Sequence, residues 1–182
     1  MSLDSLKDRL PAYAKDIKLN LSNIAASTAL NPQQAWGAML AAALAARNET
    51  VTQAIATDAA QHLSPPAMEA AKAAAAIMAM NNIYYRSVHL LGDPEYRKLP
   101  ARLRMTVIGN PGVDKLDFEL WSLAVSAVNG CGMCLEAHAH EVTSKGASRE
   151  AIQDALRIAA VIHAAVTVLE AEAAMPAIRQ AA

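Results

Sequence analysis

Asn31-Pro-Gln-Gln-Ala-Trp-Gly-Ala-Met-Leu-Ala-Ala-Ala-Leu-Ala-Ala46 is the stretch that decides the fold. Asn31 is a residue type that caps helix N-termini, and the proline directly after it suits the first helical turn. Apolar residues then recur at Trp36, Met39, Leu40, Ala43 and Leu44. This spacing is typical of one face of a helix. The stretch therefore predicts a helix with an apolar face.

The remaining sequence has the same helical character. Helix-forming residues dominate, aromatic residues make up 4%, and runs of β-branched residues are rare. Further helices are expected from Ser64-Pro65-Pro66, over about 114–128, from the cysteine pair at 131–134, and over about 149–175 after a Ser148 cap, with breaks at 92–94, 109–112 and 129–130 and a stop at Pro176. We therefore predict an all-α fold.

Two parts of the chain resemble each other. Trp36-Gly-Ala-Met-Leu-Ala-Ala-Ala-Leu44 is similar to Trp121-Ser-Leu-Ala-Val-Ser-Ala-Val-Asn129, and the residues that follow Ser64 are similar to those that follow Ser148. Chance similarity between alanine-rich helices is the alternative explanation. We expect a single domain over residues 1–182, built from two related helical halves at about 30–92 and 114–176, with the active site in the second half.

Composition and charge exclude several classes of protein. Hydrophobic residues make up 54% of the 182 residues, but the uncharged apolar stretches are shorter than the roughly 20 residues of a membrane span. A net charge of −1 argues against a nucleic-acid surface. No basic segment followed by an apolar stretch marks a signal peptide at the N-terminus. We expect a cytoplasmic protein without membrane or nucleic-acid partners.

The chain has only two cysteines, and both lie in Cys131-Gly-Met-Cys134-Leu-Glu-Ala-His138. The spacing brings the two thiols within disulfide reach, and a helix start there favours the thiolate form. His138 lies one helical turn after Cys134, where it can take the thiol proton directly or through a water. We therefore predict that Cys134 is a nucleophile and Cys131 its resolving partner.

Two other interpretations of the cysteine pair stay open at this point. Both cysteines could be small buried hydrophobic residues. Zinc could bind through Cys131, Cys134 and His138, although no second CxxC and no His-x₃₋₅-His pair completes a four-ligand site, so we expect no metal. The other histidines, which we expect to be structural or at the surface, are His62, His89, His140 and His163.

The pattern Glu119-x₁₁-Cys131-x-x-Cys134-x₃-His138 resembles the alkylhydroperoxidase D family of the carboxymuconolactone decarboxylase-like superfamily. Other stretches that resemble this family are 13–21, 76–82, 110–112 and 118–122. The resemblance implies an all-helical homotrimer that acts as an antioxidant alkyl hydroperoxide reductase. It also implies that Cys134 is oxidised to a sulfenic acid, that Cys131 closes the disulfide, and that His138 and Glu119 relay the proton.

The resemblance further implies partners and an electron source. The dithiol would regenerate a peroxiredoxin, the C component of the alkyl hydroperoxide reductase system. Electrons would come from dihydrolipoamide on a lipoylated 2-oxoacid dehydrogenase component, with no tightly bound cofactor. Met133 departs from the family, because members can carry a histidine directly before the second cysteine. Alternatives are a dithiol carrier with little peroxidase activity of its own, or a lactone decarboxylase for which the thiols are irrelevant.

Overall fold

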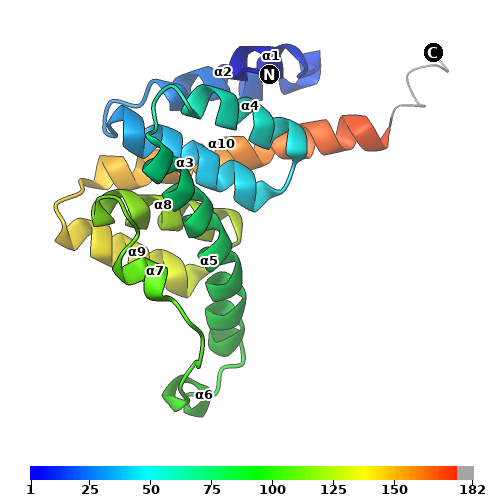
Figure 1. The fold of residues 1–182 in the computed structure, drawn as a ribbon. Coiled ribbons are helices and arrows are strands. Elements are labelled where there is room, and N and C mark those ends of the chain that lie inside the picture. The colour runs from blue at the N-terminus through cyan, green and yellow to red at the C-terminus, as the bar shows by residue number, and fades with distance from the viewer. Residues whose placement is uncertain (176–182) are drawn as a thin grey trace.

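The computed structural model describes residues 1–175, and every regular element in that part of the chain is a helix (Figure 1). The prediction of an all-α fold is confirmed. The elements are α1 (Leu3–Asp8), the 3₁₀ turn η1 (Ala12–Ala14), α2 (Lys15–Ala25), α3 (Pro32–Ala46), α4 (Glu49–Ala59), α5 (Pro65–Leu90), α6 (Glu95–Lys98), α7 (Thr106–Gly109), α8 (Lys115–Val128), α9 (Gly132–Ser144) and α10 (Arg149–Ala174).

Side chains just ahead of the helices fix where the predicted helices begin. The Asn31 side chain accepts from the Gln34 amide and Gln34 caps in return, which forms a capping box at the start of α3. Ser64 and Ser148 cap α5 and α10 in the same position. These starts agree with the sequence prediction. The predicted stop of the last helix at Pro176 lies outside the described residues.

The centre of the molecule is the contact between α3 and α8, which both also pack against α5 and α10. Trp121 of α8 is fully buried, and its indole N–H donates to the carbonyl oxygen of Gln34 at 3.1 Å. The ring lies directly on Gly37, where an added Cβ would stand 2.1 Å from the indole. A tryptophan of the second predicted half therefore packs on the helix of the first.

The helices follow one another in a repeated order. A medium helix, a shorter one and a 26-residue helix form α3–α4–α5, and the order of α8–α9–α10 is similar. This order is compatible with two related halves, which stays a prediction. The end expected for the second half, residue 176, lies outside the described residues.

The two 26-residue helices, α5 and α10, differ in how they pack against the rest of the molecule. By length and composition, α10 is the one helix of residues 1–175 that could cross a membrane, and it packs against α2, α3 and α8. The C-terminal end of α5 projects from the body of the molecule and leads to α6 (Figure 1). Large apolar side chains are exposed at this projecting end, namely Leu90, Leu91, Tyr96 and Leu99.

Candidate active site

The two cysteines lie at the turn between α8 and α9. Gly130 takes a positive φ of 66° there, a conformation that glycine adopts without strain. Cys131 is the N-cap of α9, and its sulfur accepts from the Cys134 amide at 3.3 Å. The structure joins Cys131 and Cys134 in a disulfide, with their Cα atoms 5.3 Å apart. The pair thus occupies the helix start that the sequence predicted.

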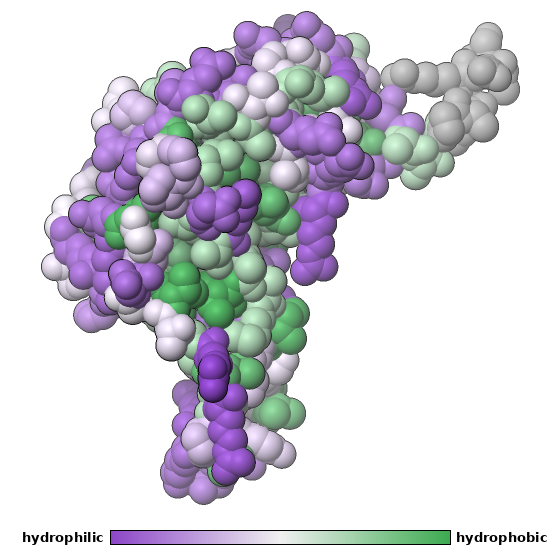
Figure 2. Space-filling view, in the orientation of Figure 1, coloured by the Kyte–Doolittle hydropathy of each residue, from purple (hydrophilic) through white to green (hydrophobic). Residues whose placement is uncertain are grey.

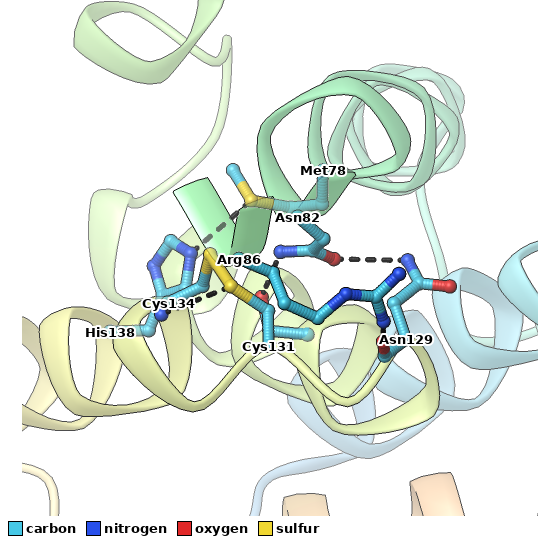
Figure 3. The surroundings of a disulfide bond; sticks show 8 residues. Met78, Asn82, Arg86, Asn129, Cys131, Cys134 and His138 are labelled. Carbon is cyan, nitrogen blue, oxygen red and sulfur yellow. Dashed lines mark hydrogen bonds between the residues drawn. A yellow bond between two sulfur atoms is a disulfide. The ribbon is translucent and has the colours of Figure 1, made fainter. Parts of the chain in front are cut away.

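A chain of hydrogen bonds, buried at Asn82 and Ser126, ties this turn to α5 (Figure 3). The Asn82 amide donates to Ser126 Oγ at 2.9 Å, and the Asn129 amide donates to Asn82 Oδ1 at 2.9 Å. Arg86, one turn further along α5, donates to the backbone carbonyl of Asn129. Because these bonds hold both the side chain and the backbone of Asn129, α5 fixes the chain just ahead of Cys131.

Glu119 and His138 form a buried pair between α8 and α9. His138 Nδ1 lies 2.6 Å from Glu119 Oε2, and the two residues are only 9% and 4% exposed. A carboxylate only accepts hydrogen bonds, so Nδ1–H donates to Glu119 and the ring is held in one orientation. The structure therefore brings Glu119 to His138, and His138 lines the same cavity as Cys134, while the roles that the resemblance implies for them stay a prediction.

The second nitrogen of the ring meets a residue that sequence reasoning missed. His138 Nε2 lies 3.2 Å from Met78 Sδ on α5 (Figure 3). A thioether is a weak acceptor that cannot donate, so an Nε2–H can point at it without losing its proton. Nδ1 thus faces Glu119 and Nε2 faces Met78, so each ring nitrogen has a defined neighbour.

A cavity of about 280 Å³ opens beside Cys134. Its walls are mostly apolar, and the residues that line it are Met78, Asn81, Tyr85, Met105, Ile108, Met133, Cys134, Ala137 and His138. Cys131 does not line it and is fully buried, whereas Cys134 retains a small exposed area. A molecule in this cavity thus contacts Cys134 rather than Cys131.

Comparisons with known proteins place the chain in a family. Residues 94–181 match the carboxymuconolactone decarboxylase family. Alkyl hydroperoxide reductase AhpD of Rhodospirillum centenum is 65% identical over 96% of this chain and 94% of its own length. The AhpD of Gluconacetobacter diazotrophicus is 57% identical over 96% of both chains, and that of Streptomyces coelicolor 56% identical over 97% and 99%. The chain belongs to the AhpD family.

The other residues singled out in the sequence lie either in the wall of this AhpD site or outside it. Met133, where the sequence departs from the family pattern, is half-buried in the cavity wall. Outside the site, the His62 ring stacks on the Trp36 ring with 4.7 Å between the ring centroids. His89 Nδ1 lies 2.9 Å from a guanidinium nitrogen of Arg97, within hydrogen-bonding distance. His140 and His163 are exposed. Among residues 1–175, no group of three or more His, Cys, Asp or Glu side chains is arranged to hold a metal ion.

Proposed function

We propose that this AhpD family member is a thiol-dependent alkyl hydroperoxide reductase. The observation that carries the proposal is the position of Cys134 in an apolar cavity, beside a histidine held by a buried carboxylate. Cys131 lies behind it at bonding distance. The name of the relatives, alkyl hydroperoxide reductase, supports the same reaction class.

The chemistry proceeds in two steps that together transfer two electrons. The Cys134 thiolate attacks the terminal oxygen of the hydroperoxide, the O–O bond breaks, and the alkoxide leaves as an alcohol after taking a proton. The resulting sulfenic acid is attacked by the Cys131 thiol, which forms the disulfide and releases water. His138 takes the Cys134 proton through Nε2 and returns it to the leaving alkoxide, while Glu119 orients the ring.

A dithiol must return the two electrons to the disulfide. We assign this role to dihydrolipoamide on a lipoylated 2-oxoacid dehydrogenase component, since a vicinal dithiol reduces a disulfide by two exchange steps. The regenerated thiols then reduce a peroxiredoxin, the C component of the alkyl hydroperoxide reductase system. A cytoplasmic homotrimer is part of the same proposal, and the reducing conditions of the cytosol suit a catalytic disulfide.

Turnover measurements test this proposal. Wild type is expected to consume cumene hydroperoxide with dihydrolipoamide as reductant, and Cys134→Ser and Cys131→Ser are each expected to abolish the catalytic cycle. Adding the peroxiredoxin separates the two redox alternatives, because turnover only in its presence identifies a dithiol carrier. Full activity of Cys134→Ser would overturn the proposal and favour a thiol-independent reaction.

A further inference from the structure

Asn81 is a buried polar residue in the wall of the cavity beside Cys134. It follows Met78 by three positions on α5, so both side chains lie on the same helix face. Asn81 is only 4% exposed, and no described residue gives its Oδ1 atom a hydrogen bond. A buried carboxamide oxygen without a partner destabilises a fold, which calls for a functional reason.

The polar residue next to Asn81 does not share this property. Asn82, the next residue, has both its amide nitrogen and its oxygen bonded, to Ser126 and Asn129. Ser122 Oγ is the other buried side-chain atom without a partner among the described residues, but it does not line the cavity. The spare hydrogen-bonding capacity of Asn81 therefore lies where a substrate would be held.

The other polar groups of the cavity wall are engaged. Tyr85 donates its hydroxyl to Met105 Sδ at 3.9 Å, and both nitrogens of His138 have partners. The rest of the wall consists of thioether and aliphatic groups. Among the described residues of the wall, Asn81 is thus the polar side chain with a buried atom that lacks a hydrogen-bond partner, beside the reacting groups Cys134 and His138.

We propose that the Asn81 carboxamide binds the hydroperoxide group of the substrate and holds it against Cys134. This role rests on the proposed peroxide reduction. A carboxamide offers one acceptor and two donors, which matches the O–O–H group. Oδ1 accepts from the terminal O–H, and Nδ2–H donates to the alkyl-side oxygen. The Cys134 sulfur bonds to the terminal oxygen, and the O–O electron pair moves to the alkyl-side oxygen, which takes its proton from His138 Nε2.

Asn81→Leu tests this role, because leucine has a similar shape and no hydrogen-bonding atoms. We expect kcat/KM for cumene hydroperoxide to fall about 10- to 100-fold, the loss of a hydrogen bond to a group that gains charge. Alkylation of reduced Cys134 by iodoacetamide and reduction of the disulfide by dihydrolipoamide are expected to stay within about twofold of wild type, since neither needs a bound peroxide. Asn81→Gln, which keeps the carboxamide, should recover part of the loss.

Ser122→Ala is the matched control, because it also removes a buried unpartnered atom but lies off the cavity. Its peroxide turnover should equal that of wild type. An Asn81→Leu variant with unchanged kcat/KM would overturn the role of Asn81, and inactive Cys134→Ser in the same assay would leave the proposed function standing. An equal fall in alkylation and in kcat/KM would identify a structural role and overturn it too. A wild type without peroxide turnover would overturn both proposals.

Discussion

His138 is held on both sides, by Glu119 at Nδ1 and by Met78 at Nε2. The carboxylate sets the orientation and tautomer of the ring, while the thioether accepts a hydrogen bond without being able to take a proton. In the proposed reaction, proton exchange with Cys134 therefore runs through Nε2, because Nδ1 is occupied by Glu119. A relay of this kind depends on a carboxylate that cannot donate to Nδ1.

Glu119→Gln tests whether the relay depends on the carboxylate, because it replaces one carboxylate oxygen by an amide NH₂ group. A glutamine amide can also donate, so it no longer enforces Nδ1–H, and the ring can present the wrong tautomer to Cys134. We expect kcat/KM for peroxide to fall about 10- to 100-fold, which is less than the roughly 10²- to 10⁴-fold that a general acid–base group itself contributes, because Glu119 acts through His138. The measurement is steady-state peroxide consumption by the folded variant. Wild-type kcat/KM in Glu119→Gln would contradict the relay.

The sequence predicts the site residues unevenly, for physical reasons. Cys131, Cys134 and His138 share one short helical segment, so their spacing alone indicates chemistry. Glu119 looks like an ordinary helix charge, and only the resemblance implies its role. Met78 lies 60 residues from His138, and a methionine in an alanine-rich helix carries no local sign of its contact. Asn81 likewise carries no local sign in the sequence of its place in the cavity wall.

At the scale of helices, the predicted starts are accurate because caps and prolines act locally. The contacts of α5 with α9 and with the turn before it could not be predicted, since they depend on which helix packs over the cysteine turn. Met78, Asn82 and Arg86 recur at helical spacing and meet α9 or the turn before it. One face of α5 thus links the first predicted half to the chemistry of the second.

The contact between α3 and α8 gives a prediction of stability. Gly37→Ala would place a Cβ 2.1 Å from the fully buried Trp121 ring, so the packing of α3 on α8 would have to shift. We expect the free energy of unfolding to fall by about 2 kcal/mol or more, because overpacking outweighs the helix propensity gained from alanine. Urea unfolding followed by circular dichroism measures the change.

Gly109→Ala is the matched control, since nothing lies within 4 Å of its added Cβ. Its free energy of unfolding should stay within about 0.5 kcal/mol of wild type. Equal midpoints for the Gly37 and Gly109 variants would contradict the close packing of α3 on α8.

At the scale of the whole molecule, the C-terminal end of α5 projects beyond the packed helices, which leave its sides exposed. Figure 2 shows apolar surface where this end joins the body, and Leu90 and Leu91 are 73% and 59% exposed. Exposed apolar patches of this kind mark association sites. The sequence predicts the helices but not this projection, because it depends on which helix ends pack against the core.

The proposed trimer gives a prediction at this scale. Light scattering of the intact chain is expected to give the mass of three copies, and a Leu90→Glu, Leu91→Glu double variant should lower it, since two carboxylates would have to be buried on association. A monomer at micromolar concentration would contradict the proposed assembly. The wild-type mass in the double variant would place the contact elsewhere on the surface.

Trapping of the sulfenic acid is the sharpest test of the roles assigned to the two cysteines. The reduced Cys131→Ser variant is treated with one equivalent of cumene hydroperoxide and then with dimedone, and the modified residue is identified by peptide mass spectrometry. We predict an adduct on Cys134, because this residue lines the cavity and no resolving thiol remains. Cys134→Ser should give no adduct on the buried Cys131. An adduct on Cys131 in Cys134→Ser, with none on Cys134 in Cys131→Ser, would contradict the assignment of Cys134 as the nucleophile.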